Sequence, residues 1–300
     1  MAIVAQQVGI LAIFALIGYV LAKTGKVKAE HSQILSTLVV YVCLPCTVFK
    51  TFSTQCNIPY LTENYPLILI STVMFSGVII ASKLAAKKLT SKSYEQNVYG
   101  YTLIVPNTGY VGNALVEHLY GSAVLLNQML YNLPLTFFTY TEGYRMLTGG
   151  EKLTLKRLLN PVTIAILLGC TVGVLAIPIP DLLMTVVDRA NNCMAPLSML
   201  LTGIAISEFH LPKLLQNRMA YLITFLRLLV IPFVMAGIAS LFFSREIVLA
   251  TLMMYSMPCG LNTIIFPKLI GEDCEIGASL ALLSNVLAIV TIPLGVAVFL

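Results

Sequence analysis

Charged residues are scarce in this chain. They make up 10% of its 300 residues, whereas hydrophobic residues make up 58%, and the mean hydropathy is +0.90. The longest polar stretch, near residues 146–159, is too short to form a separate soluble domain. This composition predicts an integral membrane protein whose chemistry takes place in or beside the bilayer.

Other features that the sequence lacks exclude further kinds of protein. The amino-terminal end has no basic segment and no small-residue cleavage site after Ala15, so the first apolar run is expected to be a retained helix rather than a signal peptide. The seven cysteines lie mostly inside apolar runs and form no secreted disulfide framework. The three histidines are far apart, without metal-ligand spacing, and no metal or other cofactor is expected. The net charge of +5 comes from basic residues scattered between apolar runs, which favours membrane topogenesis over nucleic-acid binding.

Apolar runs, each about 20 residues long, follow one another along the chain. They lie near residues 4–22, 34–53, 66–86, 97–119, 122–145, 160–178, 184–206, 219–243, 247–270 and 276–299. Basic residues gather in alternate connections, and the positive-inside rule then places those connections in the cytoplasm and both termini outside. The sequence predicts an all-α, multi-pass protein of the cell inner (plasma) membrane with about ten transmembrane helices.

The fourth run contains the stretch Tyr101–Asn113, whose middle is unlike an ordinary membrane helix. Pro106 removes one backbone hydrogen bond, and Gly109 loosens the segment that follows. A break at this depth leaves backbone polar groups in the bilayer, where they are tolerated only if they are buried in protein or line a wet cavity. We therefore expect a binding site here, to which Asn107 and Thr108 contribute.

The ninth run repeats this arrangement, with a break at Pro258 and Gly260 followed by Asn262 and Thr263. Prolines are spaced almost equally in the two halves of the chain, with 61 residues from Pro45 to Pro106 and 62 from Pro196 to Pro258. Five spans in each half, residues 1–147 and 148–300, would place the second half upside down relative to the first. Inverted repeats with matching broken helices indicate a secondary transporter, and independent proline kinks are the alternative.

The breaks favour an anionic substrate. The free amides at the amino end of a half-helix carry a partial positive charge that suits carboxylates. Neutral hydrogen bonds could come from Asn107, Thr108, Asn113, Asn262 and Thr263. The alternative is that these side chains only satisfy the freed backbone groups.

Arg227 is the most informative charge, because it follows Arg218 by nine residues and so lies about 13 Å deeper along a helix. A buried arginine needs a partner, and Glu142, the nearest acid by depth, is close to the end of its own span. The carbonyl ends of the broken helices or the substrate itself could serve instead, so a structural and a substrate-binding role both stay open. No acid pair is found at mid-depth, and a carboxylate proton relay is not expected.

Two other functions are considered. Cys43 and Cys46 have the C-x-x-C spacing of redox proteins, so a membrane thiol-redox enzyme is one alternative. A kinked helix with two small thiols explains the pair better, since no thioredoxin-like pattern surrounds it. A channel or sensor built on a transporter fold is the other alternative. The favoured interpretation is a carrier rather than an enzyme.

The segment Val105–Gly112, which reads VPNTGYVG, resembles the fourth-helix crossover of the auxin efflux carrier family, which includes plant PIN-type carriers and bacterial malate or malonate permeases. Met257–Leu261, followed by Phe266–Lys268, is similar to the matching segment of the ninth helix. Cys259 differs from the polar residue that follows this proline in some plant members.

The resemblance implies a 5 + 5 inverted repeat with crossing broken helices, an architecture like that of bile-acid symporters and sodium–proton antiporters. Helices 1, 2, 6 and 7 would form a scaffold, and helices 3–5 and 8–10 a moving domain. Small organic anions would be the substrates, and a homodimer would form through the scaffold. The resemblance also implies crossover roles for Pro106, Asn107, Thr108, Pro258 and Gly260.

Overall fold

A computed structural model describes residues 2–28, 32–150, 159–269, 272 and 274–299. The described residues form helices joined by short connections, and the one extended pairing among them is an isolated antiparallel bridge between Pro106 and Cys259. Residues 151–158 of the expected central polar loop lie outside the described part. The prediction of an all-α protein is confirmed for the described chain.

The helices of the first part of the chain follow one another with few interruptions. They are α1 (Ala2–Lys23), α2 (Ser32–Leu38), the π-helical turn η2 (Val39–Cys43), α3 (Leu44–Gln55), α4 (Ile58–Leu89), α5 (Ser93–Ile104), the π-helical η3 (Thr108–Gly112), α6 (Asn113–Tyr131), α7 (Leu133–Phe138), the π-helical η4 (Thr139–Gly143) and α8 (Tyr144–Leu147).

The second part continues with α10 (Pro161–Val174), α11 (Asp181–Ser207), α12 (Leu211–Gln216), α13 (Arg218–Phe225), the π-helical η5 (Leu226–Val230), α14 (Ile231–Phe242), α15 (Arg245–Tyr255), α16 (Asn262–Leu269) and α17 (Glu275–Phe299). Five stretches of the described chain are long and apolar enough to cross a membrane alone. They are Ile3–Lys23, Ser32–Gln55, Ile58–Leu89, Arg218–Phe242 and Glu275–Phe299. The number of about ten spans stays a prediction.

Local sequence signals explain where several helices begin and turn. The helix that contains the apolar run near 66–86 is longer than the run, because α4 begins at Ile58. Asn57 caps this helix by accepting a 2.8 Å hydrogen bond from the Tyr60 amide, and a proline in the first turn costs no helical hydrogen bond. The turn between the expected fourth and fifth spans lies at Gly121, whose φ of 83° favours glycine.

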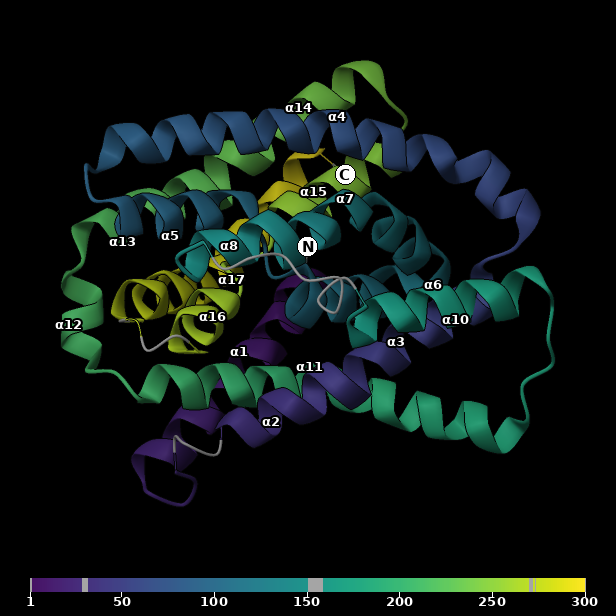
Figure 1. The fold of residues 1–300 in the computed structure, drawn as a ribbon, viewed down its shortest axis with the longest axis horizontal. Helices are drawn as coiled ribbons and strands as arrows, with labels where there is room; N and C mark the ends of the chain where they lie inside the picture. Colours follow the sequence, from purple (N-terminus) through teal and green to yellow (C-terminus); the bar gives the residue numbers. More distant parts are fainter. Residues whose placement is uncertain (1, 29–31, 151–158, 270–271, 273, 300) are drawn as a thin grey trace.

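Two long helices frame the molecule: α4 and α11 run lengthwise along opposite margins, with α1, α15 and α17 between them (Figure 1). One large cluster of buried apolar side chains joins α4, α5, α13, α14 and α15, and a second joins α1, α3, α6, α10 and α11 with parts of α15 and α17. A smaller third cluster joins α11, α12, α16 and α17. The buried apolar residues of α5 belong to the first cluster and most of those of α6 to the second, so the two parts of the broken fourth span pack in different places.

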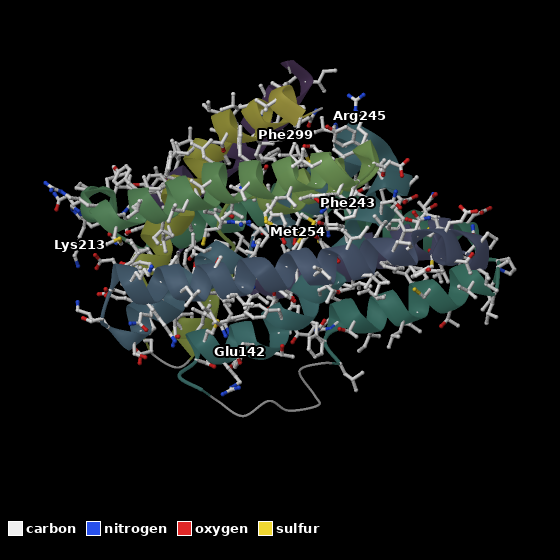
Figure 2. The ribbon with its side chains drawn as sticks, turned by 90° about the horizontal axis from the view of Figure 1, so that it is seen from above. Glu142, Lys213, Phe243, Arg245, Met254 and Phe299 are labelled. Carbon is white, nitrogen blue, oxygen red and sulfur yellow. The ribbon has the colours of Figure 1, made fainter. Side chains whose placement is uncertain are left out.

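The outer surface is apolar over much of its length. Large apolar side chains such as Leu16, Val73 and Leu241 are more than half exposed, as expected for contact with hydrocarbon. Figure 2 shows Lys213 at one end of the molecule, while Met254 lies near its middle and is fully buried. Apolar side chains exposed along the outer helices are what contact with a bilayer requires.

Candidate functional site

The two broken helices meet at their breaks. Helix α5 ends at Ile104 and the chain becomes helical again at Thr108, while α15 ends at Tyr255 and α16 begins at Asn262. The two non-helical stretches pair antiparallel between Pro106 and Cys259, and the Asn107 amide donates a 2.8 Å hydrogen bond to the carbonyl oxygen of Pro258. Each break thus supplies a backbone partner for the other, which removes part of the cost of interrupting a helix inside the membrane.

In each broken span, the helical segment that follows the break begins at the crossing. In the first of them, the amides of Val111 and Gly112 bond back to the carbonyl oxygen of Asn107. The earliest amides of such a segment have no partner within their own helix, so those of Thr108 and Gly109 are presented at the crossing. The partial positive charge of this amino end therefore lies where the two breaks meet.

A cavity of about 90 Å³ lies against the crossing. One buried water occupies roughly 10–15 Å³ by this measure, so the space admits several waters or a small organic molecule. The expected site residues that line it are Pro106, Asn107, Thr108, Gly109, Asn113, Gly260 and Asn262. None of its described lining residues carries a charge.

From the second break, Gly260 and Asn262 line this cavity. Asn262 is held by a 3.0 Å hydrogen bond from its Nδ2 to the hydroxyl of Tyr101, which fixes the direction of its amide. A Cβ atom at Gly260 would lie 4.0 Å from the Cα atom of Asn107, so the two breaks pass close together at this point with room for a small side chain. The polar groups of both broken helices therefore approach one small space.

Two other predicted residues of the second break do not line the cavity. Thr263 is fully buried, and its hydroxyl donates a 3.0 Å hydrogen bond to the carbonyl oxygen of Gly260. Pro258 faces a different cavity of about 240 Å³, which is almost entirely apolar and lies between α1, α11 and α17. The structure places both residues as supports of the break rather than as lining groups.

Arg227 is also absent from the cavity lining. It is fully buried on η5 and donates a 3.3 Å hydrogen bond from Nη1 to the carbonyl oxygen of Leu103, in the last turn of α5. Its position agrees with the alternative that the carbonyl end of a broken helix is its partner. Glu142 instead pairs with Lys83 at 3.1 Å and with Arg145 at 3.2 Å.

Sequence reasoning missed the part of the site that comes from the expected fifth span. Asn132, Thr136, Thr139 and Tyr140 line the cavity opposite the crossing. Asn127, seven residues before Pro134 in the same span, accepts a hydrogen bond from the Tyr60 hydroxyl and lies outside the lining of this cavity. A polar face recurring every three to four residues around Pro134 was the signal available for the residues that do line it.

The candidate redox pair lies outside the cavity at the crossing. Cys43 and Cys46 are both free thiols, and they flank the start of α3, where Pro45 occupies the first turn. Cys46 lines a larger cavity of about 840 Å³, which adjoins the first at Tyr140, a residue common to both linings.

Comparison with known proteins places this arrangement in a family. A model of the membrane transport protein family matches the chain twice, over residues 3–152 and 145–296. The chain belongs to this family. The match confirms the resemblance to auxin efflux carriers expected from the segments at the two breaks.

A relative supports the same assignment. An uncharacterized transporter of Methanocaldococcus jannaschii is 24% identical to this chain over 300 residues, an alignment that covers 95% of each protein. Family membership and the long apolar helices together make this chain a multi-pass membrane protein of the transporter class.

Proposed function

We propose that this protein is a secondary carrier of small organic anions, mono- or dicarboxylates, and that it moves them by alternating access at the crossing of the two broken helices. The proposed substrate-binding residues are Asn107, Thr108, Asn113, Gly260 and Asn262, with Thr263 and Arg227 holding the breaks in position.

One observation carries this proposal: the cavity at the crossing combines the amino end of a half-helix with neutral polar side chains. Backbone amides at such an end attract carboxylates, and no described lining residue has a negative charge that would repel them. Asn107, Asn113 and Asn262 can donate from their amide groups without forming a permanent ion pair. A site of this kind binds an anion and still lets it leave, as a carrier requires.

Alternating access needs two bodies that move relative to each other. We assign the scaffold to the helices of the first, second, sixth and seventh spans and the moving domain to the others, in two inverted halves, residues 1–147 and 148–300. The first cluster of buried apolar side chains supports this division, because all of its buried residues lie in spans assigned to the moving domain, which can then keep that core during the movement. The second cluster joins scaffold helices with α6, so it is where the two bodies meet. In the same proposal the protein lies in the cell inner membrane with both termini outside and forms a homodimer through the scaffold.

The test is a flux screen with purified protein in liposomes. Labelled mono- and dicarboxylates are offered one at a time, with empty liposomes as the control. A carrier will show saturable uptake that is accelerated by unlabelled substrate on the opposite side. Flux that does not saturate and shows no such counterflow would indicate a channel and contradict the proposal.

One double variant distinguishes the carrier from the thiol-redox enzyme. Cys43→Ser combined with Cys46→Ser should leave carboxylate flux at the wild-type rate, because neither sulfur lines the cavity at the crossing. If the wild type has a disulfide-exchange activity and the variant loses both this activity and the flux, the enzyme is favoured instead.

The proposed homodimer has a test of its own, which is native mass spectrometry of the protein released from lipid nanodiscs.

A further inference from the structure

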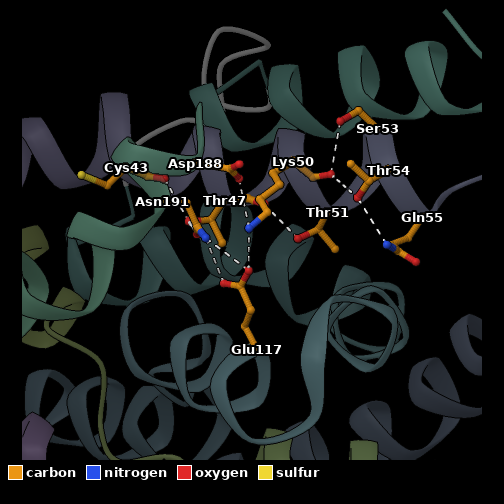
Figure 3. A network of polar contacts seen from close by, with 10 residues as sticks. All are labelled: Cys43, Thr47, Lys50, Thr51, Ser53, Thr54, Gln55, Glu117, Asp188 and Asn191. Carbon is orange, nitrogen blue, oxygen red and sulfur yellow. Dashed lines mark hydrogen bonds and ion pairs between the residues drawn. The ribbon is translucent and has the colours of Figure 1, made fainter. Parts of the chain in front are cut away.

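A second polar cluster lies between α3, α6 and α11, away from the crossing. Figure 3 shows the Lys50 amine between two carboxylates, with Glu117 Oε1 at 3.3 Å and Asp188 Oδ1 at 3.1 Å. Asn191 donates from Nδ2 to both oxygens of Glu117, at 3.2 and 3.1 Å, and its own Oδ1 accepts a 2.6 Å hydrogen bond from Thr47. Glu117 is thus held by three contacts from two other helices.

The cluster connects parts of the molecule that belong to different proposed bodies. Lys50 is on α3 and Asp188 and Asn191 are on α11, two helices assigned to the scaffold, whereas Glu117 is on α6, which continues from the break at the crossing. Asn113, one helical turn before Glu117, lines the cavity at the crossing. A movement of α6 that exposes the site would therefore have to separate Glu117 from Lys50 and Asn191.

The cluster also lies on one particular side of the site. Glu117 lies between Asn113, which lines the cavity at the crossing, and the turn at Gly121, and Asp188 lies near the start of α11. The 840 Å³ cavity extends from residues close to the expected central loop to Phe49 and Val187, the neighbours of Lys50 and Asp188. The charged cluster therefore covers the site on the side of the turn at Gly121.

We propose that Lys50, Glu117, Asp188 and Asn191 form the gate that closes the transport route on the side of Gly121, and that the negative charge on Glu117 holds it shut. This inference rests on the proposed carrier function. The gate opens when Glu117 separates from Lys50 and Asn191. Glu117 and Asn191 line a polar cavity of about 230 Å³, which gives water a place beside the carboxylate.

The charges explain why Glu117 holds the gate. With all groups ionised, Lys50 faces two carboxylates, and the side chains of Lys50 and Glu117 are only 24% and 20% exposed, so solvent screens their attraction incompletely. Without the charge on Glu117, Lys50 is paired with Asp188 within the scaffold alone, and the bonds from Asn191 become neutral ones, which are weaker. The connection from the scaffold to α6 is then weakened, while the scaffold keeps its own ion pair.

One other group that can carry a charge faces the same space. His118 follows Glu117 on α6 and lines the 230 Å³ cavity. The groups that surround Glu117 from the packed helices are therefore Lys50 on α3, Asp188 and the neutral Asn191 on α11, and His118 on its own helix. A test of the gate has to separate Glu117 from His118.

The first measurement needs no substrate. Hydrogen–deuterium exchange of residues 113–120 is compared between the wild type and Glu117→Gln, which removes the charge and keeps the size of the side chain. Exchange should become roughly tenfold faster in the variant, the change expected for the loss of one charge-assisted hydrogen bond. Glu142→Gln makes the same chemical change in another ion-paired carboxylate and should leave this segment unchanged. Equal exchange in the wild type and Glu117→Gln would overturn the gate.

The second measurement is carboxylate flux in liposomes at a fixed pH. Glu117→Gln should be faster than the wild type, because its charge no longer holds the gate, and His118→Gln should follow the wild type. Wild-type flux in Glu117→Gln, or faster flux in His118→Gln, would overturn the role of Glu117. Absence of flux in the wild type would contradict the proposed function, whereas the exchange result would still decide the gate. If Glu117→Gln does not fold, Lys50→Gln, which removes the opposite charge of the same pair, takes its place in the exchange measurement.

Discussion

The two helix breaks have matching sequences but different surroundings. The first break presents Pro106, Asn107 and Thr108 to the cavity at the crossing. In the second break, Cys259 and Thr263 are fully buried. The amide of Cys259 bonds to the Ser284 hydroxyl at 2.9 Å, which ties this break to α17. The first break therefore faces the site, and most of the second is built into the protein behind it.

This difference shows that a repeated motif need not have a repeated role. The cavity beside Pro258 is almost entirely apolar, whereas the cavity beside Pro106 has asparagine and threonine side chains around it. Only Gly260 and Asn262 of the second break reach the polar cavity. Variants at matched positions of the two breaks should consequently have unequal effects, and the following predictions compare them.

The largest effect is expected where the second break packs against α17. A Cβ atom at Gly277 would lie 2.2 Å from the carbonyl oxygen of Thr263, whereas one at Gly260 would have open space to 4.0 Å. Gly277→Ala should therefore destabilise the protein by about 3 kcal/mol or more, the upper range for overpacking a core. Gly260→Ala should fold normally. Thermal unfolding in detergent measures both, and equal midpoints would contradict the tight packing at Gly277.

The next effect concerns the paired asparagines. Asn107→Ala should lower carboxylate flux per folded protein roughly tenfold, the loss expected when one hydrogen bond to a charged ligand is removed. Asn262→Ala should lower it by less, because part of the bonding capacity of Asn262 is already used by Tyr101. Uptake normalised to purified protein is the measurement, with Asn127→Ala as a control outside the cavity lining. Wild-type rates in both cavity variants would place the site elsewhere.

A smaller effect is expected at the prolines. The bridge between Pro106 and Cys259 and the bond from the Asn107 amide to Pro258 hold the breaks open from outside each helix, so Pro106→Ala should keep the break. Anion affinity should fall about threefold through partial loss of the oriented amides. Pro258→Ala should change affinity less, because Pro258 faces the apolar cavity. Equilibrium binding of a labelled carboxylate checks this order, and a larger loss at Pro258 would reverse the comparison.

The smallest effects distinguish the two threonines. Thr263→Val should lower the free energy of unfolding by about 1 kcal/mol, since its buried hydroxyl bonds to the Gly260 carbonyl oxygen. It should leave anion affinity unchanged. Thr108→Val should do the opposite, weakening binding about threefold through loss of one neutral hydrogen bond while the protein stays equally stable. Denaturation and binding measured on the same preparations would show whether the two roles are separate.

The amino-acid sequence by itself determined that the protein lies in a bilayer and where two of its helices break. Scarcity of charge requires burial in a bilayer, and proline with glycine inside an apolar run prevents a continuous helix wherever the chain folds. The family could be recognised for the same reason, because the residues at the breaks are adjacent in the chain.

Only the tertiary structure decided which side chains face the site. Arg227 and Thr263 are at the expected positions along their helices but point into protein, whereas Asn132 and Thr136 from another helix complete the cavity. Lys50 and Glu117 are separated by 67 residues, and nothing in their spacing indicates an ion pair. The direction of a side chain depends on how each helix is rotated against its neighbours. That rotation is set by the packing of many apolar contacts together rather than by any local pattern.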